Sequence, residues 1–199
     1  MVRCIHNKRR RAATLNLVHF SIPETVNGDD IRVIRKRSGL TQKQFAQWCN
    51  VSVKTVERWE SSKEPVHGPV TTLLAVMINY PDLFREYTLD PAPYNMRLYY
   101  YYRSFLCTII DVNERKRTVK IRNYVNDLQM RAFGVVEHPS FDQYEEFLES
   151  RCFPRQADKM KIRLRELDLP FYDPIMIVEK TEGRVEGGEF WIRVERTGT

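Results

Sequence analysis

The sequence predicts an α+β protein with an N-terminal all-α domain and a C-terminal α+β domain that has an antiparallel sheet. Apolar residues between positions 27 and 90 recur at helical spacing, whereas residues 98–124 contain aromatic and β-branched runs. Pro91 and Pro93 separate the two regions, and proline disfavours both helix and central strand. We expect four segments. These are an arm over 1–26, a helical domain over 27–90, a linker over 91–96 and an α+β domain over 97–199.

Positive charge is concentrated in the first half of the 199-residue chain. The formal net charge is +6; residues 1–90 hold 14 Lys and Arg against 9 Asp and Glu, and residues 91–199 hold 18 against 17. A basic domain beside a nearly neutral one is typical of proteins whose basic part binds polyphosphate. The 42% of hydrophobic residues suffices for genuine cores and argues against global disorder.

A basic run, Lys8, Arg9, Arg10 and Arg11, occupies the predicted arm, and no acidic residue precedes Glu24. Two interpretations stay open. The run is an arm that reaches a DNA minor groove or follows phosphates, as arms do in other DNA-binding proteins. Alternatively, it is a solvated tail or an extension upstream of the natural start.

The helical domain begins with a helix expected over residues 29–38. Asp29 is a suitable cap, and Gly39 ends the helix. Ile31 and Ile34 face the core. The basic residues of this helix are suited equally to phosphate contact and to a solvated face; they are Arg32, Arg35, Lys36 and Arg37.

The next segment predicts two short helices joined by a tight turn. Thr41 can cap the first helix, with Gln44 completing a capping box, and Ser52 can cap the second. Asn50 lies in the turn, where the backbone often adopts a positive φ that Asn tolerates. An apolar set faces inward: Phe45, Ala46, Val51, Val56 and Trp59.

Six polar side chains of this helix pair are expected to point outward. Each can donate a hydrogen bond to a phosphate or a base edge, and none is acidic. They are Gln42, Lys43, Ser52, Lys54, Thr55 and Arg58. The second helix is the one expected to enter a DNA major groove.

Residues 27–90 resemble the Xre (phage-repressor-like) helix-turn-helix family. The matching residues are Thr41-Gln42, Phe45-Ala46, Val51-Ser52, Thr55-Val56 and Trp59-Glu60, followed by Gly68-Pro69, Leu73-Leu74 and Pro81-Asp82-Leu83. The resemblance implies a homodimer on double-stranded DNA, bound to an inverted repeat whose half-sites lie about 34 Å apart. Lys54, Thr55 and Arg58 would then face base edges, with Arg58 reading guanine. Gln42, Lys43 and Ser52 would hold phosphates.

A fourth helix is expected from Gly68-Pro69 to Asn79, ended by Pro81, with one more turn over residues 83–87. Its apolar stripe would serve the core and, in part, a dimer contact. The stripe consists of Leu73, Leu74, Met77 and Ile78.

The C-terminal domain is expected to contain an antiparallel meander with strands over 98–102, 106–112 and 118–124. A capping box at Ser140 and Gln143 starts a helix, a second helix carries Ala157, Met160, Leu164 and Leu167, and a third runs from Asp173-Pro174 to Gly183. A last strand over 190–195 joins the sheet. Of the four tyrosines at 99–102, two are expected in the core.

No pattern predicts catalysis, a cofactor or a metal site, so the chain is expected not to be an enzyme. Cys152 lies between Arg151 and Arg155, which favours a thiolate, but no base is near it in sequence. Carboxylates at Asp173, Glu179 and Glu182 suggest Mg²⁺, yet Asp173 already caps a helix. Cys4 and His6 lack a second ligand pair.

The chain has no apolar run of the length, about 18 residues, that spans a membrane, and its start lacks a secretory core. We expect a cytoplasmic protein, bacterial or phage-encoded and associated with the nucleoid.

Three functions follow as hypotheses. The first is a sequence-specific transcriptional repressor that regulates its own operon, as antitoxins do. The second is a phage-type inhibitor of host defence, similar to anti-CRISPR proteins, whose C-terminal domain blocks a protein or ribonucleoprotein. The third is a nucleic-acid-processing enzyme.

Overall fold

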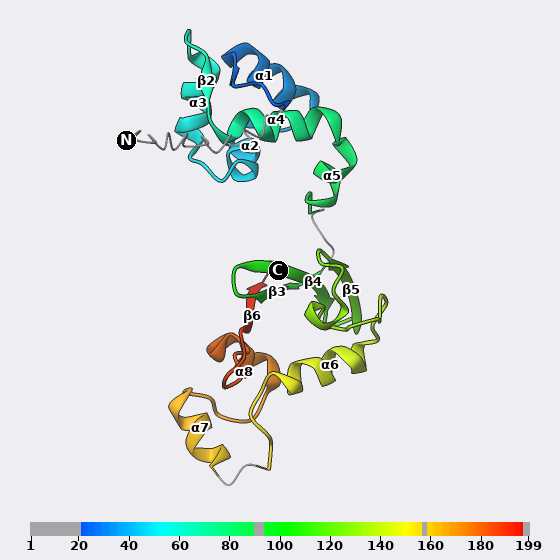
Figure 1. The fold of residues 1–199 in the computed structure, drawn as a ribbon. Coiled ribbons are helices and arrows are strands. Elements are labelled where there is room, and N and C mark those ends of the chain that lie inside the picture. The colour runs from blue at the N-terminus through cyan, green and yellow to red at the C-terminus, as the bar shows by residue number, and fades with distance from the viewer. Residues whose placement is uncertain (1–20, 90–93, 157–158, 197–199) are drawn as a thin grey trace, which may run out of the picture. The chain divides into compact units, whose positions relative to one another are not determined.

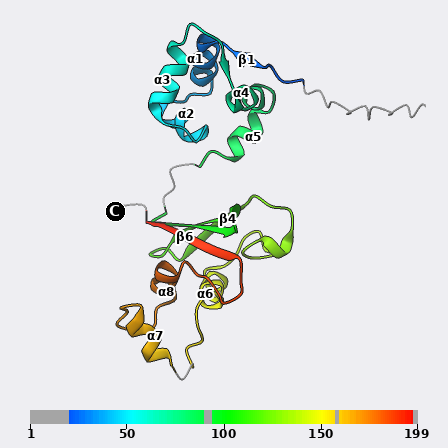
Figure 2. The same ribbon diagram turned by 60° about the vertical axis from the view of Figure 1, so that its left-hand side comes forward.

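The computed structural model describes residues 21–89, 94–156 and 159–196. The chain divides into two compact units, residues 1–89 and 90–199, which are described separately (Figures 1 and 2). The basic run at 8–11, together with Cys4 and His6, lies outside the described residues. The α+β fold class is confirmed, with helices in the first unit and the larger sheet in the second.

The described part of the N-terminal unit consists of helices around one apolar core, with a short strand pair. Its elements are β1 (Thr25–Val26), α1 (Gly28–Arg37), α2 (Gln42–Trp48), α3 (Val53–Ser61), β2 (Val66–His67), α4 (Pro69–Asn79) and α5 (Pro81–Glu86). The core contains Ile31, Phe45, Ala46, Val56, Val66, Val70, Leu74 and Met77. The predicted helices are present, and the inward-facing set belongs to this core or packs against it.

The first helix begins earlier than predicted. Asn27, with φ −83° and ψ 152°, is the residue before the helix, so Asp29 does not cap it but lies in its first turn. Acidic side chains there interact favourably with the positive end of the helix dipole. The start fits tightly against α3, because a Cβ on Gly28 would overlap the carbonyl oxygen of Trp59.

The all-α prediction for this unit omits one pair of strands. Thr25 pairs with His67 and Val26 with Val66 in an antiparallel ladder. Thr25 and Val26 fall within the predicted arm, so ordered structure begins before residue 27. Two-residue strands carry no periodicity, which is why the sequence pattern does not reveal them.

Helix α4 starts at Pro69, as predicted, after Gly68 at φ 106°. Its expected apolar stripe is only partly correct. Leu74 and Met77 are buried, whereas Ile78 is 58% exposed. Thr71 is buried in its place, and its hydroxyl donates to the carbonyl of Gly68 at 3.0 Å.

The C-terminal unit is built on a four-stranded antiparallel sheet in the order β5-β4-β3-β6. Its strands are β3 (Met96–Tyr102), β4 (Phe105–Asn113), β5 (Thr118–Asn123) and β6 (Phe190–Arg196). Its helices are η1 (Leu128–Met130), α6 (Phe141–Ser150), α7 (Met160–Glu166) and α8 (Pro174–Thr181). The meander is confirmed, and the last strand joins the sheet beside β3, with Tyr102 opposite Phe190 and Met96 opposite Arg196.

One face of the sheet packs against α6 and α8 (Figure 2). Strand alternation sends Tyr100 and Tyr102 to this core face, while Tyr101 stacks on Trp191 with ring centroids 4.5 Å apart. The expectation of two core tyrosines is thus confirmed for the apolar cluster, although Tyr99 is also buried, beneath Arg193.

The helix boundaries of this unit follow the predicted caps. Ser140 and Gln143 form a capping box. Asp173 accepts the backbone N–H groups at the start of α8, and that helix ends where Glu182 and Gly183 adopt φ 54° and 58°. Helix α7 begins at Met160, and Ala157 lies outside the described residues.

Candidate nucleic-acid interface

The helix pair α2–α3 is fixed by caps and by the turn between the helices. The Thr41 hydroxyl accepts from the N–H of Gln44 at 3.2 Å, and the Gln44 side chain accepts the N–H of Thr41 at 2.9 Å. Asn50 adopts φ 53°, as the turn requires. The N–H of Val51 then donates to the carbonyl of Ala46 at 2.9 Å, which closes the turn. The two helices are therefore held in one mutual orientation.

Three of the six predicted outward residues are cations with exposed side chains. The side-chain nitrogens of Lys43, Lys54 and Arg58 make no hydrogen bond or ion pair with any residue in the described part of the chain. Lys54 and Arg58 are four residues apart on α3 and therefore lie on the same face of that helix. This face presents positive charge that no described residue neutralises through an ion pair.

Ser52 and Thr55 are engaged with each other at the start of α3. The Ser52 hydroxyl accepts the N–H of Thr55 at 3.1 Å, and the two hydroxyl oxygens lie 2.9 Å apart. Thr55 is half-buried, whereas Ser52 is exposed. The cap is as predicted, but it ties the Thr55 hydroxyl to the helix start.

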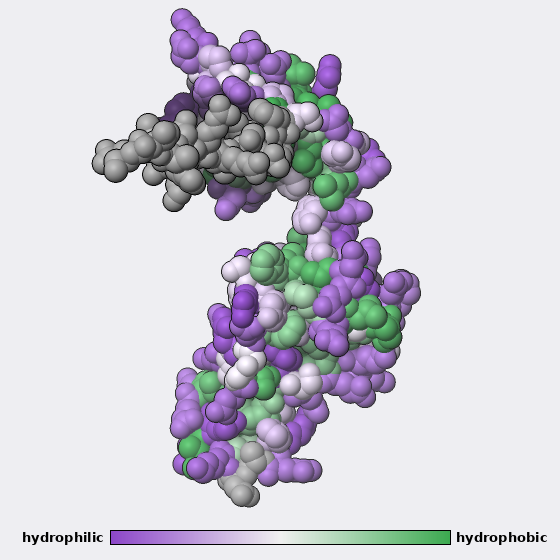
Figure 3. Space-filling model, in the orientation of Figure 1, coloured by the Kyte–Doolittle hydropathy of each residue, from purple (hydrophilic) through white to green (hydrophobic). Residues whose placement is uncertain are grey.

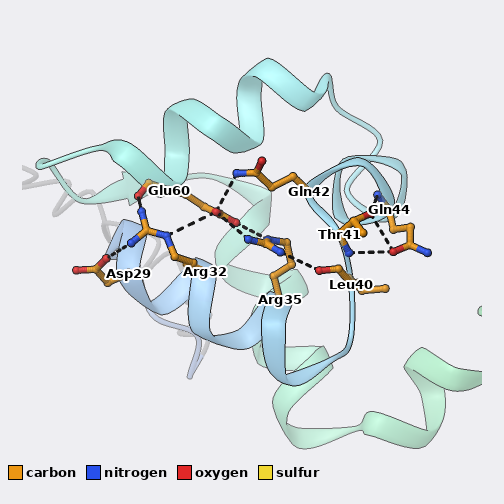
Figure 4. Close-up of polar contacts among 8 residues, drawn as sticks. All are labelled: Asp29, Arg32, Arg35, Leu40, Thr41, Gln42, Gln44 and Glu60. Carbon is orange, nitrogen blue, oxygen red and sulfur yellow. Dashed lines mark hydrogen bonds and ion pairs between the residues drawn. The ribbon is translucent and has the colours of Figure 1, made fainter.

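Gln42 does not point outward as the sequence suggests. Its side-chain amide donates to Oε2 of Glu60 at 3.1 Å, and the residue is half-buried (Figure 4). This bond links the first turn of α2 to the last turn of α3. Gln42 therefore positions the helix pair through Glu60.

A buried ion pair underlies this link. Arg35 of α1 donates from Nε to Oε1 of Glu60 at 2.6 Å and from Nη2 to Oε2 at 3.0 Å. Its Nη1 also donates to the carbonyl of Leu40 at 2.8 Å (Figure 4). The side chains of Arg35 and Glu60 are 10% and 4% exposed. Arg35 is thus a structural residue, which excludes the phosphate-contact and solvated-face interpretations for it.

The electrostatics of Glu60 reflect these partners. Burial alone would raise the pKa of this carboxyl, but hydrogen bonds from Arg35 and Gln42 outweigh it and hold the pKa below its ordinary value of 4.5. Arg32 adds a further contact, with Nε 3.7 Å from Oε2. The carboxylate is therefore charged and fully paired inside the unit.

Two residues of α3 were missed as candidates. Glu57 is an exposed carboxylate three residues after Lys54 and next to Arg58. Val53, the first residue of α3, is 37% exposed although it is apolar. An exposed carboxylate can accept from cytosine N4, and an exposed valine can contact the thymine methyl group. Both are visible in the sequence, since they lie at the start and on the solvent side of the predicted second helix.

The cysteine between two arginines is not activated. Burial raises the pKa of the Cys152 thiol to about 11. Its Sγ donates to the carbonyl of Leu148 at 3.2 Å. Arg151 donates instead to the carbonyls of Gly183 and Phe190, both at 3.1 Å. Arg151 therefore stabilises the fold. The charge of Arg155 lowers the pKa of the Cys152 thiol, but burial outweighs it, so the thiolate is not favoured.

The suggested Mg²⁺ carboxylates do not converge. Asp173 accepts two backbone N–H groups at its Oδ1. Glu179 pairs with Arg196 at 2.7 Å, and Glu182 pairs with Arg184 at 2.8 Å. Within residues 21–89, 94–156 and 159–196 no group of three or more His, Cys, Asp or Glu is arranged to hold a metal ion. Across the same ranges every helix is too short or too polar to traverse a lipid bilayer.

Comparison of the chain with protein-family models gives no match, and comparison with curated protein sequences gives none either.

Proposed function

We propose that this protein is a sequence-specific DNA-binding repressor that acts as a homodimer in the bacterial cytoplasm and regulates its own operon, as antitoxins do. In this proposal α2 and α3 are an Xre-type helix-turn-helix, and α3 enters the major groove. The observation that supports it best is the pair Lys54 and Arg58. Both are exposed, unpaired among the described residues, and on one face of a helix whose orientation is fixed.

The roles of the side chains follow from their geometry. Arg58 and Lys54 contact base edges, and Arg58 binds guanine O6 and N7 with two hydrogen bonds. Lys43 and Ser52 contact phosphates, which set the register of the protein on the duplex. Thr55 also contacts DNA, with its hydroxyl held by Ser52 at the start of α3. Gln42 positions α2 against α3 through Glu60.

In this proposal the dimer contact lies on α4 and α5. Tyr80, Ile78 and Leu83 are 63%, 58% and 41% exposed. Figure 3 shows hydrophobic surface over this part of the N-terminal unit. Exposed apolar patches of this kind mark interaction surfaces, and aromatic residues are enriched where interfaces are buried. A second copy of the chain would cover this apolar surface.

A selection of duplexes from a random library with the full chain tests this function. The proposal expects enrichment of one inverted repeat, with half-sites about 34 Å apart as two-fold symmetric proteins require. The variant Lys54→Ala/Arg58→Ala should enrich nothing. Enrichment of the same repeat by that variant would contradict the role given to α3.

The alternative is that the C-terminal unit is the effector, a phage-type inhibitor of host defence similar to anti-CRISPR proteins. The observation that favours it is an aromatic and arginine surface on the sheet, where Arg193 lies 4.1 Å from the Tyr99 ring centroid and Arg184 5.2 Å from that of Trp191. Such residues are enriched in protein interfaces and also stack on bases. Biological activity that survives Lys54→Ala/Arg58→Ala in the full chain would favour this inhibitor, and loss of activity favours the repressor.

A further inference from the structure

A cavity of about 370 Å³ lies in the C-terminal unit between α6, the start of α8 and the turn after β4. Its walls combine apolar side chains with carboxylates. Phe141, Leu148 and Ile175 supply the apolar part. The carboxylates are Glu114, Glu145, Glu149 and Asp173, and Arg155 lies at the same cavity.

Tyr144, which also lines this cavity, has an unpaired hydroxyl. The residue is 2% exposed, and its hydroxyl oxygen has no hydrogen-bond partner among the described residues. The charged neighbours of this hydroxyl are Glu114, Asp173 and Glu145, which line the same cavity, and Arg196. Burial raises the pKa of this hydroxyl, which therefore stays neutral and can accept a hydrogen bond. A buried polar group without a partner is costly, and a bound ligand would supply the missing one.

The carboxylates differ in how they are neutralised. Glu145 lies 3.1 Å from Arg117, and Glu149 pairs with Arg155. Glu114 accepts from the amide of Asn95 at 2.9 Å, which is a neutral donor.

Asp173 likewise accepts neutral backbone N–H groups at 3.0 and 3.2 Å. Among the described residues, neither Glu114 nor Asp173 forms an ion pair. Arg196 is near Tyr144 and Glu114, but its Nε donates to Glu179 at 2.7 Å. Among the described residues, the cavity thus holds two carboxylates that form no ion pair and a hydroxyl that has no hydrogen-bond partner.

We propose that this cavity binds a small organic cation, an alkyl ammonium or alkyl guanidinium ion. Its N–H groups donate to Glu114, Asp173 and the hydroxyl of Tyr144, and its alkyl chain packs against the apolar walls. A metal ion fits less well, because the described residues hold no metal-binding cluster and the cavity far exceeds the size of an ion. The site makes the C-terminal unit a sensor, which goes beyond the proposed DNA binding and does not depend on it.

Amide chemical-shift titrations of the full chain test the site. The probes are n-butylammonium and n-butylguanidinium, with n-butanol as the uncharged control and Mg²⁺ as the metal control. We expect saturable shifts around α6 and the start of α8 with at least one organic cation, and none with n-butanol or Mg²⁺. Glu114→Gln and Tyr144→Phe should each weaken binding at least tenfold. Glu146→Gln, an exposed change on the same helix outside the cavity, should bind as the natural chain does.

Tyr144→Phe also separates binding from folding. Because it removes an unpaired hydroxyl and keeps the ring, its melting temperature without ligand should equal or exceed that of the natural chain. The proposal is overturned if neither cation gives saturable shifts, if n-butanol or Mg²⁺ binds as well, or if Tyr144→Phe binds as tightly as the natural chain.

Discussion

The exposed cations of the α2–α3 helix pair differ from five exposed arginines of the C-terminal unit in whether a carboxylate lies against them. In the C-terminal unit five arginines each lie against a carboxylate: Arg103, Arg117, Arg155, Arg184 and Arg196. On α2 and α3, Lys43, Lys54 and Arg58 have no such partner among the described residues. Exposed ion pairs contribute little to stability, but they cancel the charge that a polyanion would meet. The charge on α2 and α3 that has no partner among the described residues is therefore available to phosphates and base edges.

Buried ion pairs hold cations that a ligand cannot reach. Arg35 and Glu60 join α1 to α3 within the N-terminal unit, while Arg97 and Asp111 are cross-strand neighbours in the sheet, with Nε 2.5 Å from Oδ1. Each fixes elements in place, so their cations are not available to a ligand.

The largest expected effect comes from the buried pair. Arg35→Ala leaves the buried carboxylate of Glu60 without its main partner, which should lower the free energy of unfolding of the N-terminal unit by about 3–5 kcal/mol. Hydrogen exchange of the α1–α3 amides measures this. Arg117→Ala, which removes exposed ion pairs and a cation–π contact with Phe141 in the other unit, should leave those amides unchanged. Equal effects of the two changes would contradict the distinction.

The second effect concerns sequence reading. Arg58→Ala should cost about 1–3 kcal/mol of binding free energy on the selected duplex and relax its base preference, because one bidentate base contact is lost. Fluorescence anisotropy with selected and scrambled duplexes measures both. Arg193→Ala in the other unit serves as the matched control and should change neither. An equal loss on both duplexes would show that Arg58 contacts phosphate and not base.

Acid should weaken the N-terminal unit through Glu60. Its pKa is lower in the folded state than its ordinary value of 4.5, so the pair contributes stability that is complete above about that pH and is lost as the pH falls through the lowered pKa. Glu60→Gln should flatten this dependence below pH 4.5, as followed by hydrogen exchange. Glu57→Gln, an exposed change on the same helix, should retain the natural slope; if Glu60→Gln also retains it, another group is responsible.

The smallest effect is on salt dependence. Lys43→Ala removes one phosphate contact, so the slope of log affinity against log salt should decrease in magnitude by about one. Its sequence preference should be unchanged. A steeper loss on one sequence alone would assign Lys43 a base contact.

Features set by neighbouring residues could be predicted from the sequence. The capping boxes at Thr41 and Ser140, the turn at Asn50 and the alternating strands all depend on spacings of a few residues, and the structure contains them. Their physics is local, because a side chain reaches a backbone group within one helical turn.

Features set by distant residues could not. Arg35 and Glu60 lie 25 residues apart, and their pairing depends on how α1 packs on α3. For the same reason Gln42 was expected to point outward, whereas its amide bonds to Glu60, 18 residues later. The helix start at Gly28 packs closely against the backbone of Trp59, a long-range contact that no local pattern indicates.

The most direct test of the central claim is the affinity of the full chain for its selected duplex and for a scrambled duplex at one physiological salt concentration. The proposal predicts an affinity ratio of about 10³ or more, which falls sharply in Lys54→Ala/Arg58→Ala and stays unchanged in Arg103→Ala. Equal affinities for the two duplexes in the natural chain would contradict sequence-specific reading by α3.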